Sequence, residues 1–110
     1  MAEFLQVSTA TEDRSSAEAL ARSTVSARLA AGAQIVGPVL SAFWHEGEFG
    51  TGEEWQLLFK IRADRYADLE RHLLDQHPWK NPEITAVPIV AGSAAYLRWV
   101  SATTAPEAQD

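Results

Sequence analysis

The sequence predicts an α+β domain of the ferredoxin-like type, in which the split βαβ order β-α-β-β-α-β is followed by one extra C-terminal helix. Three observations lead to this fold class. Two segments have the apolar spacing of helices, and four have the character of strands. Two prolines within expected strands, Pro38 and Pro88, fall where this topology has its edge strands, which tolerate a missing amide. Local chemistry and topology therefore agree.

Composition narrows the class of protein. A chain of 110 residues has the length of one domain, and 46% hydrophobic residues are enough for a core. A net charge of −6 argues against nucleic acid as a partner, and no apolar run is long enough to predict a membrane span. Cysteine is absent, which excludes disulfides and thiolate metal sites. We expect one cytoplasmic domain over residues 1–103 with a flexible tail at 104–110.

The first half of the fold begins with a short strand at residues 4–9. Polar residues 11–13 can each begin the following helix, and the spacing of Ser15 and Glu18 is that of a capping box. The helical pattern predicts a helix that reaches about Ala31, with Gly32 as its stop.

A long hairpin is expected next. Residues 33–45 form an extended segment that Gly37-Pro38 interrupts, which indicates a bulge or an edge position. Gly47 and residues 50–52 are expected to be turn residues. The returning strand alternates clearly, and its apolar face holds Trp55, Leu57, Phe59 and Ile61.

The second half repeats the helix and strand pattern. Asp64 is expected to cap a helix that ends before His77-Pro78, because proline disfavours the helical conformation in the residue before it. The inward side of that helix is expected to hold Tyr66, Leu69, Leu73 and Leu74. A strand follows at residues 84–90, and Gly92-Ser93 precede a terminal helix at residues 94–100.

The hairpin is too long for the rest of the sheet. Its strands of about 10 to 13 residues span roughly 35 to 40 Å, which neighbouring strands of about six residues cannot cover. The overhang is expected to carry Phe43, Trp44, Phe49 and Trp55. Such an apolar edge favours self-association, which would contribute several kcal/mol at about 25 cal/mol per Å². The alternative is a hairpin folded back on its own core.

The hairpin tip, His45-Glu46-Gly47-Glu48, is the best candidate for a metal site within one chain. It combines an imidazole with carboxylates, which suit a hard or borderline cation. The alternative is a solvated acidic turn.

The other histidines give less support for a metal site. His72 and His77 are five residues apart, about 140° around a helix, so they cannot chelate one ion from a single face. Asp68 and His72 have i, i+4 spacing, which more often indicates an exposed pair. A structural alternative for His77 is that it caps the carbonyls at the end of its helix while Trp79 packs on an associated copy, since a protonated histidine at that end is stabilised by about 0.3 to 1 kcal/mol.

The sequence resembles the CutA divalent-cation-tolerance family over about residues 4–100. Six segments in register carry the resemblance: ARLAAG at 27–32, FWHEGE at 43–48, EEWQLLFKI at 53–61, HPWKNPEI at 77–84, VPIVAG at 87–92 and YLRW at 96–99. The resemblance implies a PII-like homotrimer with strands paired between subunits. It also implies a role in tolerance or homeostasis of divalent metals such as copper, or in signalling.

The resemblance further implies that the loop HPWKNPE lies beside a cleft between subunits. The residues implied to line this cleft are Trp79, Lys60, Tyr96 and Trp99. The residues implied or proposed as ligands of Cu or Zn are His77, Glu83, His45 and Glu46. A small effector could occupy the same cleft.

The chain departs from the family pattern at several positions. Ser8 and Gly32 stand where members linked to copper often have cysteine, so a soft Cu(I) thiolate site is absent. His45 replaces a tryptophan, Glu48 a basic residue and Lys80 an acid. These changes motivate a second hypothesis, an enzyme that uses the same cleft. His77 or His45 would then act as general base, and Glu83 or Glu48 would orient or protonate the substrate.

Overall fold

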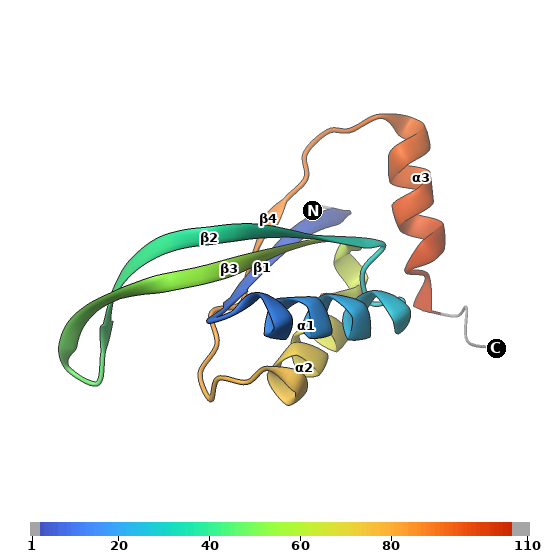
Figure 1. Ribbon diagram of the computed structural model, residues 1–110. Helices are drawn as coiled ribbons and strands as arrows, with labels where there is room; N and C mark the ends of the chain where they lie inside the picture. The colour runs from blue at the N-terminus through green and yellow to red at the C-terminus, as the bar shows by residue number, and fades with distance from the viewer. Residues whose placement is uncertain (1–2, 107–110) are drawn as a thin grey trace.

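The computed structural model describes residues 3–106 of the chain. The main elements follow the predicted order, β-α-β-β-α-β and a further helix (Figure 1). Their bounds are β1 Phe4–Thr11, α1 Arg14–Ser26, β2 Gly32–His45, β3 Glu48–Arg62, a 3-10 turn at Ala63–Arg65, α2 Tyr66–Gln76, β4 Thr85–Pro88 and α3 Ala94–Thr103.

The four strands form one antiparallel sheet in the order β2-β3-β1-β4. This confirms the predicted α+β fold with the split βαβ order, and it places Pro38 and Pro88 on the two edge strands. Figure 1 shows α1 and α2 together on one side of the sheet, whereas α3 stands at the end where β2 begins. None of the helices in the described part of the chain is long and apolar enough to span a membrane.

The core lies between the sheet and the helices α1 and α2. The predicted alternation of β3 is confirmed, because Leu57, Phe59 and Ile61 have no exposed surface. They pack in one cluster with Val7 of β1 and with apolar residues of both helices, among them Ala17, Leu20, Leu69 and Leu73. Burial of a side chain of this size is worth about 1.5 to 3 kcal/mol, so this face of the sheet holds the subunit together.

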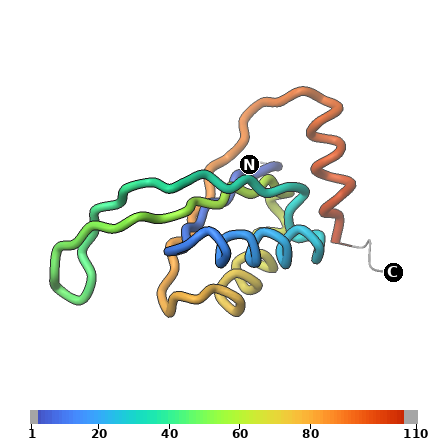
Figure 2. The backbone as a smooth tube through the Cα atoms, viewed as in Figure 1, coloured from blue at the N-terminus to red at the C-terminus, as the bar shows by residue number. Residues whose placement is uncertain are grey.

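The hairpin projects beyond the rest of the sheet as predicted. β1 pairs with β3 only as far as Trp55, so residues 48–54 of β3 are paired with β2 alone. We call residues 39–54 the arm; its two strands run on without a third (Figure 2). Leu40, Trp44 and Phe49 are 78%, 74% and 64% exposed on it. The alternative of a hairpin folded over its own core is therefore wrong.

The base of the arm is marked by a β-bulge. The register shifts between Val36 and Val39, around the cis Gly37–Pro38 peptide bond. Trp55 lies over Gly37, because a Cβ built on this glycine would be 2.6 Å from the Cε3 atom of the indole. Trp55 also packs against the core cluster. The prediction that Trp55 belongs to the exposed overhang is wrong for this reason.

The helix α1 begins as predicted and ends earlier. Asp13 is its N-cap, and the Oδ1 atom accepts a hydrogen bond of 2.8 Å from the Ser16 amide. The last helical residue is Ser26, whereas the sequence predicted about Ala31. Arg28 adopts a φ of 61°, and the Ala31 amide donates to the Lys60 carbonyl at 2.9 Å. Pairing with β3 therefore replaces the last helical turn.

The turn of the hairpin is shorter than predicted. Residues 50–52 belong to β3 and pair with residues 41–43 of β2, so the expectation that they form a loop is wrong. The connection consists of Glu46 and Gly47 alone, with φ values of 52° and 82°. Positive φ at both central residues is typical of the tight turns whose twist matches a hairpin.

Smaller corrections concern the second half of the chain. Asp64 is not a helix cap: its carboxylate accepts two hydrogen bonds from Arg62, at 3.0 and 2.7 Å. Leu74 is 54% exposed, so it does not face the core. The strand β4 is shorter than the predicted 84–90, and α3 continues three residues beyond Val100. Thr104 is buried, and residues 107–110 of the expected tail lie outside the described residues.

Candidate functional site

His77 closes the helix α2 and sits at the beginning of the predicted site loop, residues 77–83. Its amide donates to the Leu73 carbonyl at 2.9 Å, and its side chain is buried. The ring lies between two backbone groups. The Trp79 amide donates to Nδ1 at 3.1 Å, and Nε2 is 2.8 Å from the carbonyl oxygen of Ala10 in β1.

These contacts define the form of the ring. Because Nδ1 accepts a hydrogen bond from the Trp79 amide, Nε2 carries the ring hydrogen and donates to Ala10, which makes a neutral imidazole. Burial lowers the pKa of His77, although the Ala10 carbonyl acts in the opposite direction. Neither nitrogen has a lone pair left for a metal or a substrate proton. While the bond from the Trp79 amide holds, His77 can therefore act neither as a ligand nor as a general base.

The rest of the loop presents one aromatic ring and one carboxylate. The ring of Trp79 is half-buried and lies 5.3 Å from that of His77, measured between centroids. Glu83 is exposed, and within residues 3–106 its side chain has no hydrogen bond or ion pair. Lys80 is also exposed. Glu83 is the loop's free ligand group.

Another group of the predicted cleft residues lies on α3 and on the part of β3 next to it. Tyr96 and Trp99 are tilted against each other with centroids 5.6 Å apart, and they are 42% and 48% exposed. Trp99 lies over Gly32, whose Cβ would be 3.7 Å from the ring. Lys60 is the cross-strand neighbour of Gly32, so its side chain projects from the same face of the sheet. Three of the four predicted cleft residues therefore share one surface.

The fourth cleft residue, Trp79, lies elsewhere in the subunit. His77 holds its loop at Ala10, whereas Lys60 is in register with Gln6 of β1. These two points on β1 are four residues apart, or roughly 13 Å at about 3.3 Å per residue. In Figure 1 the segment that follows α2 lies below the sheet on the side away from the helix α3. One subunit does not bring the predicted cleft together.

The hairpin tip places its polar groups in solvent. His45 pairs with Glu48 at the last position of the ladder, and His45 Nε2 lies 3.8 Å from Glu46 Oε2. The side chains of His45 and Glu46 are 77% and 85% exposed. Among the described residues no group of three His, Cys, Asp or Glu side chains is arranged to hold a metal. Over residues 3–106, one subunit by itself therefore has no preformed metal site.

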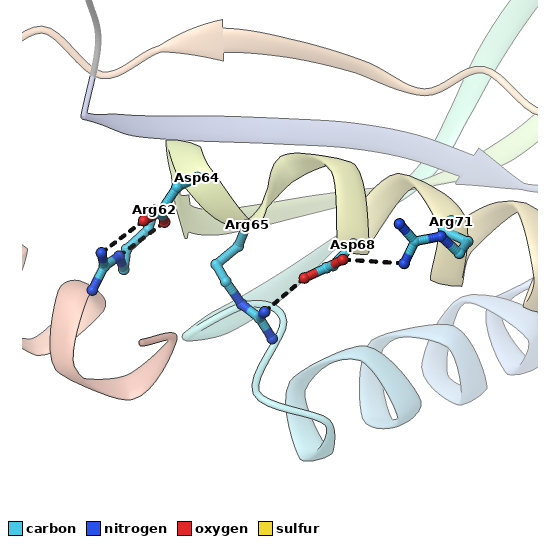
Figure 3. Close-up of polar contacts among 5 residues, drawn as sticks. All are labelled: Arg62, Asp64, Arg65, Asp68 and Arg71. Atoms are coloured by element: carbon cyan, nitrogen blue, oxygen red, sulfur yellow. Dashed lines mark hydrogen bonds and ion pairs between the residues drawn. The ribbon is translucent and has the colours of Figure 1, made fainter. Parts of the chain in front are cut away.

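The helix α2 uses its polar side chains for structure. Asp68 accepts hydrogen bonds from Arg65 at 2.7 Å and from Arg71 at 3.1 Å, and Figure 3 shows it between the two guanidinium groups. His72 Nε2 lies 3.0 Å from Ser23 Oγ of α1. The possible Asp68 and His72 pair is replaced by these partners. The i, i+3 spacing of Asp68 with Arg65 and with Arg71 is the sequence signal that indicates these two pairs.

Comparison with known proteins gives consistent matches. The family model described as CutA1 divalent ion tolerance protein matches residues 5–103. The Divalent-cation tolerance protein CutA of Pectobacterium atrosepticum is 34% identical over 91 residues, 83% of each protein. Protein CutA 1, chloroplastic, of Oryza sativa is 36% identical over 85 residues, 77% of this chain and 48% of that protein. The chain thus spans about half the length of that rice relative.

Solved structures agree with these matches. The crystal structure of CutA1 from Oryza sativa superimposes with a TM-score of 0.91 at 30% identity, and the alignment covers 96% of this chain and 97% of that one.

Proposed function

Since the chain belongs to the CutA1 divalent ion tolerance protein family, we propose that it works as a homotrimer that binds a divalent cation or a small effector in clefts between its subunits. Its role would be in metal tolerance or in signalling, and we propose a cytoplasmic location. The observation that carries the proposal is the arm, which exposes Leu40, Trp44 and Phe49 to solvent. Apolar surface of this kind marks an interaction site.

The geometry of the arm supports a closed ring of copies. An arm that lies against the body of the next subunit is a contact between two different surfaces, and such head-to-tail contacts close into rings when the rotation permits. The loop 77–83 and the helix α3, which carries Tyr96 and Trp99, lie apart in one subunit (Figure 1). A ring can bring the loop of one copy beside α3 of the next, which one chain cannot do.

The donor groups available to a cation are few. Glu83 in the loop and His45 with Glu46 at the tip remain candidate ligands, because their side chains are exposed. Lys60, Trp79, Tyr96 and Trp99 are proposed to line the cleft for an effector. Copper and zinc both accept imidazole and carboxylate ligands. Within the described part of the chain, no observation favours the enzyme hypothesis.

Assembly is the first test. Multi-angle light scattering should give about three times the subunit mass of 12.1 kDa at micromolar concentration. Trp44→Glu places a charge on the exposed face of the arm and should convert the protein to a folded monomer. Gln34→Glu adds the same charge at an exposed position outside the arm and serves as a control. A stable 12.1 kDa particle from the unmodified chain would overturn the proposal.

Metal binding is the second test. Titration calorimetry with Cu²⁺ and Zn²⁺ should give micromolar or tighter binding by the assembled protein. Glu83→Gln or His45→Ala should weaken it by about tenfold or more, because each removes a ligand atom, and that loss corresponds to about 1.4 kcal/mol. His72→Ala is the matched control, since that ring contacts Ser23. If neither heat nor a thermal shift is seen, the cation is excluded and the effector remains.

A further inference from the structure

The ring of His77 connects three elements that are far apart in the sequence. The His77 backbone amide closes α2, while the ring donates a hydrogen bond to the Ala10 carbonyl of β1 and accepts one from the Trp79 amide of the loop. We call this ring with its bonds to Ala10 and Trp79 the clasp. Pro78, the residue between His77 and Trp79, has no amide to donate. The Trp79 amide bond is therefore the first backbone anchor of the loop.

Protonation changes the two bonds of the clasp in opposite ways. Nε2 carries a hydrogen in both the neutral and the charged ring, so the bond to Ala10 persists. Nδ1 gains a hydrogen and can no longer accept one, which leaves it facing the Trp79 amide across 3.1 Å. Two donors at this distance repel, and the loop loses its anchor while the ring stays attached to β1.

We propose that the clasp is a pH-sensitive device, in which a proton taken up by His77 releases residues 78–83 from the body of the subunit. The release would uncover Trp79 and move Glu83. The inference concerns contacts inside one subunit and does not rest on the proposed trimer or its ligand. If the proposed trimer also forms, acid would in addition change the position of the loop 77–83 beside the proposed cleft.

The surroundings of the clasp provide no charge that would hold the proton. None of the charged side chains on the elements around the ring forms an ion pair with it, within residues 3–106. The charged side chains nearest in the sequence to the clasp are all exposed to solvent: Glu12, Asp13, Asp75, Lys80 and Glu83. Burial without a carboxylate partner disfavours the charged ring, in keeping with its lowered pKa. The clasp is therefore closed at neutral pH and strained by acid.

The linkage between proton and loop has a definite sign. When the loop is released, Nδ1 of the ring becomes open to water while Nε2 keeps its bond to Ala10, so the pKa rises toward the usual value near 6.5; in the closed clasp the pKa is lower. The open form therefore binds the proton more strongly. The opening constant should rise as pH falls below 6.5, by up to about tenfold per pH unit, and level off below the pKa of the closed clasp.

Amide hydrogen exchange of the assembled full-length protein tests this directly. After correction for the intrinsic exchange rate, the opening constant of the Trp79 amide should rise as the pH is lowered from 7 to 5. The expected rise is up to about tenfold for each pH unit below 6.5. The Ala31 amide, which donates to Lys60 far from the clasp, should stay unchanged. Long-range ¹⁵N correlation spectra of the His77 ring should show the Nε2–H form at pH 7.

Two outcomes would overturn the proposal. One is a Trp79 amide that keeps its protection while the ring of His77 becomes protonated. The other is a rise in exchange that Trp79 and Ala31 share, which would indicate unfolding of the whole subunit. Both are read from the unmodified protein, so the test does not depend on a variant that folds.

Variants sharpen the result. Glutamine can accept from the Trp79 amide and donate to Ala10, and it does not titrate, so His77→Gln should remove the pH dependence of the Trp79 amide. His72→Gln and His45→Gln should each keep it, because neither ring touches the clasp. A pH dependence that survives in His77→Gln would assign the effect to another group and exclude the clasp.

Discussion

β2 and β3 run through two regions of the molecule with opposite surroundings. Over residues 55–61 of β3, the apolar face is covered by α1 and α2, and its Leu57, Phe59 and Ile61 are fully buried. Over residues 48–54 the same pair of strands continues as the arm, and Phe49 on it is 64% exposed. The strands are regular in both places. The difference teaches that regular pairing does not create burial, which depends on what is packed against the face.

The largest test of this comparison removes one phenylalanine from each region. Phe59→Ala should lower the free energy of unfolding by about 3 to 5 kcal/mol, the usual cost of a large cavity in a core. Phe49→Ala removes the same atoms from the arm, where the ring touches Trp44 and most of its surface would be covered only by an associated copy. Urea unfolding measured over a hundredfold range of protein concentration distinguishes a loss of core packing from a loss of association.

The concentration dependence decides the outcome. The loss in Phe59→Ala should be similar at every concentration, whereas the loss in Phe49→Ala should shrink as dilution favours the dissociated form. A Phe49→Ala variant that loses as much stability as Phe59→Ala at all concentrations would show that the arm is packed within its own subunit.

A second test acts at the boundary between the two regions. Gly37→Ala would place a methyl group 2.6 Å from Trp55, the residue that closes the core at the base of the arm. Relief of this overlap needs a shift of the indole or of the bulge, with an expected loss of about 1 to 3 kcal/mol in thermal or urea unfolding.

The matched control for that change is Gly52→Ala, also on the hairpin. Its new methyl group would lie 3.9 Å from Phe43, an ordinary contact. This variant should unfold like the unmodified protein or slightly later. Equal losses in both variants would mean that glycine is required for the strands in general and that Trp55 has no special role.

The smallest expected effect concerns the charged surface of the core region. Arg71→Ala removes one of the two guanidinium groups on Asp68 in Figure 3, and the Arg71 side chain is 73% exposed. An exposed pair of this kind contributes between 0 and about 1 kcal/mol. Arg65→Ala should cost more, because the side chain of Arg65 is only 14% exposed. If Arg71→Ala costs more than Arg65→Ala in urea unfolding, exposure does not rank these pairs.

The sequence was sufficient wherever local pattern decides structure. The alternation around Leu57 and Phe59 predicted both the strand and its buried face, because a strand has a period of two. The prolines predicted the edge strands, and the length of the hairpin predicted its overhang. The resemblance to the CutA family was also confirmed, by the match over residues 5–103.

The failures have in common a partner that is distant in the sequence. The end of α1 depends on the Ala31 amide finding the Lys60 carbonyl, and helix propensity over residues 27–31 contains no sign of it. The surroundings of His77 depend in the same way on a distant partner, because its ring is engaged by Ala10, 67 residues earlier. The proposed cleft residues stay predictions, since the surface that they would share is proposed to form between copies.

The bulge at the base of the arm also sets which way the hairpin faces. Between the pairs Val36 with Gln56 and Val39 with Glu54, β2 uses one residue more than β3, so even-numbered side chains of β2 change sides. Leu40 and Trp44 thereby join the side on which Trp55 lies, instead of the opposite one. A chain one residue shorter at the bulge would keep the same hydrophobic side chains, but Leu40 and Trp44 would then lie on the opposite side of the hairpin.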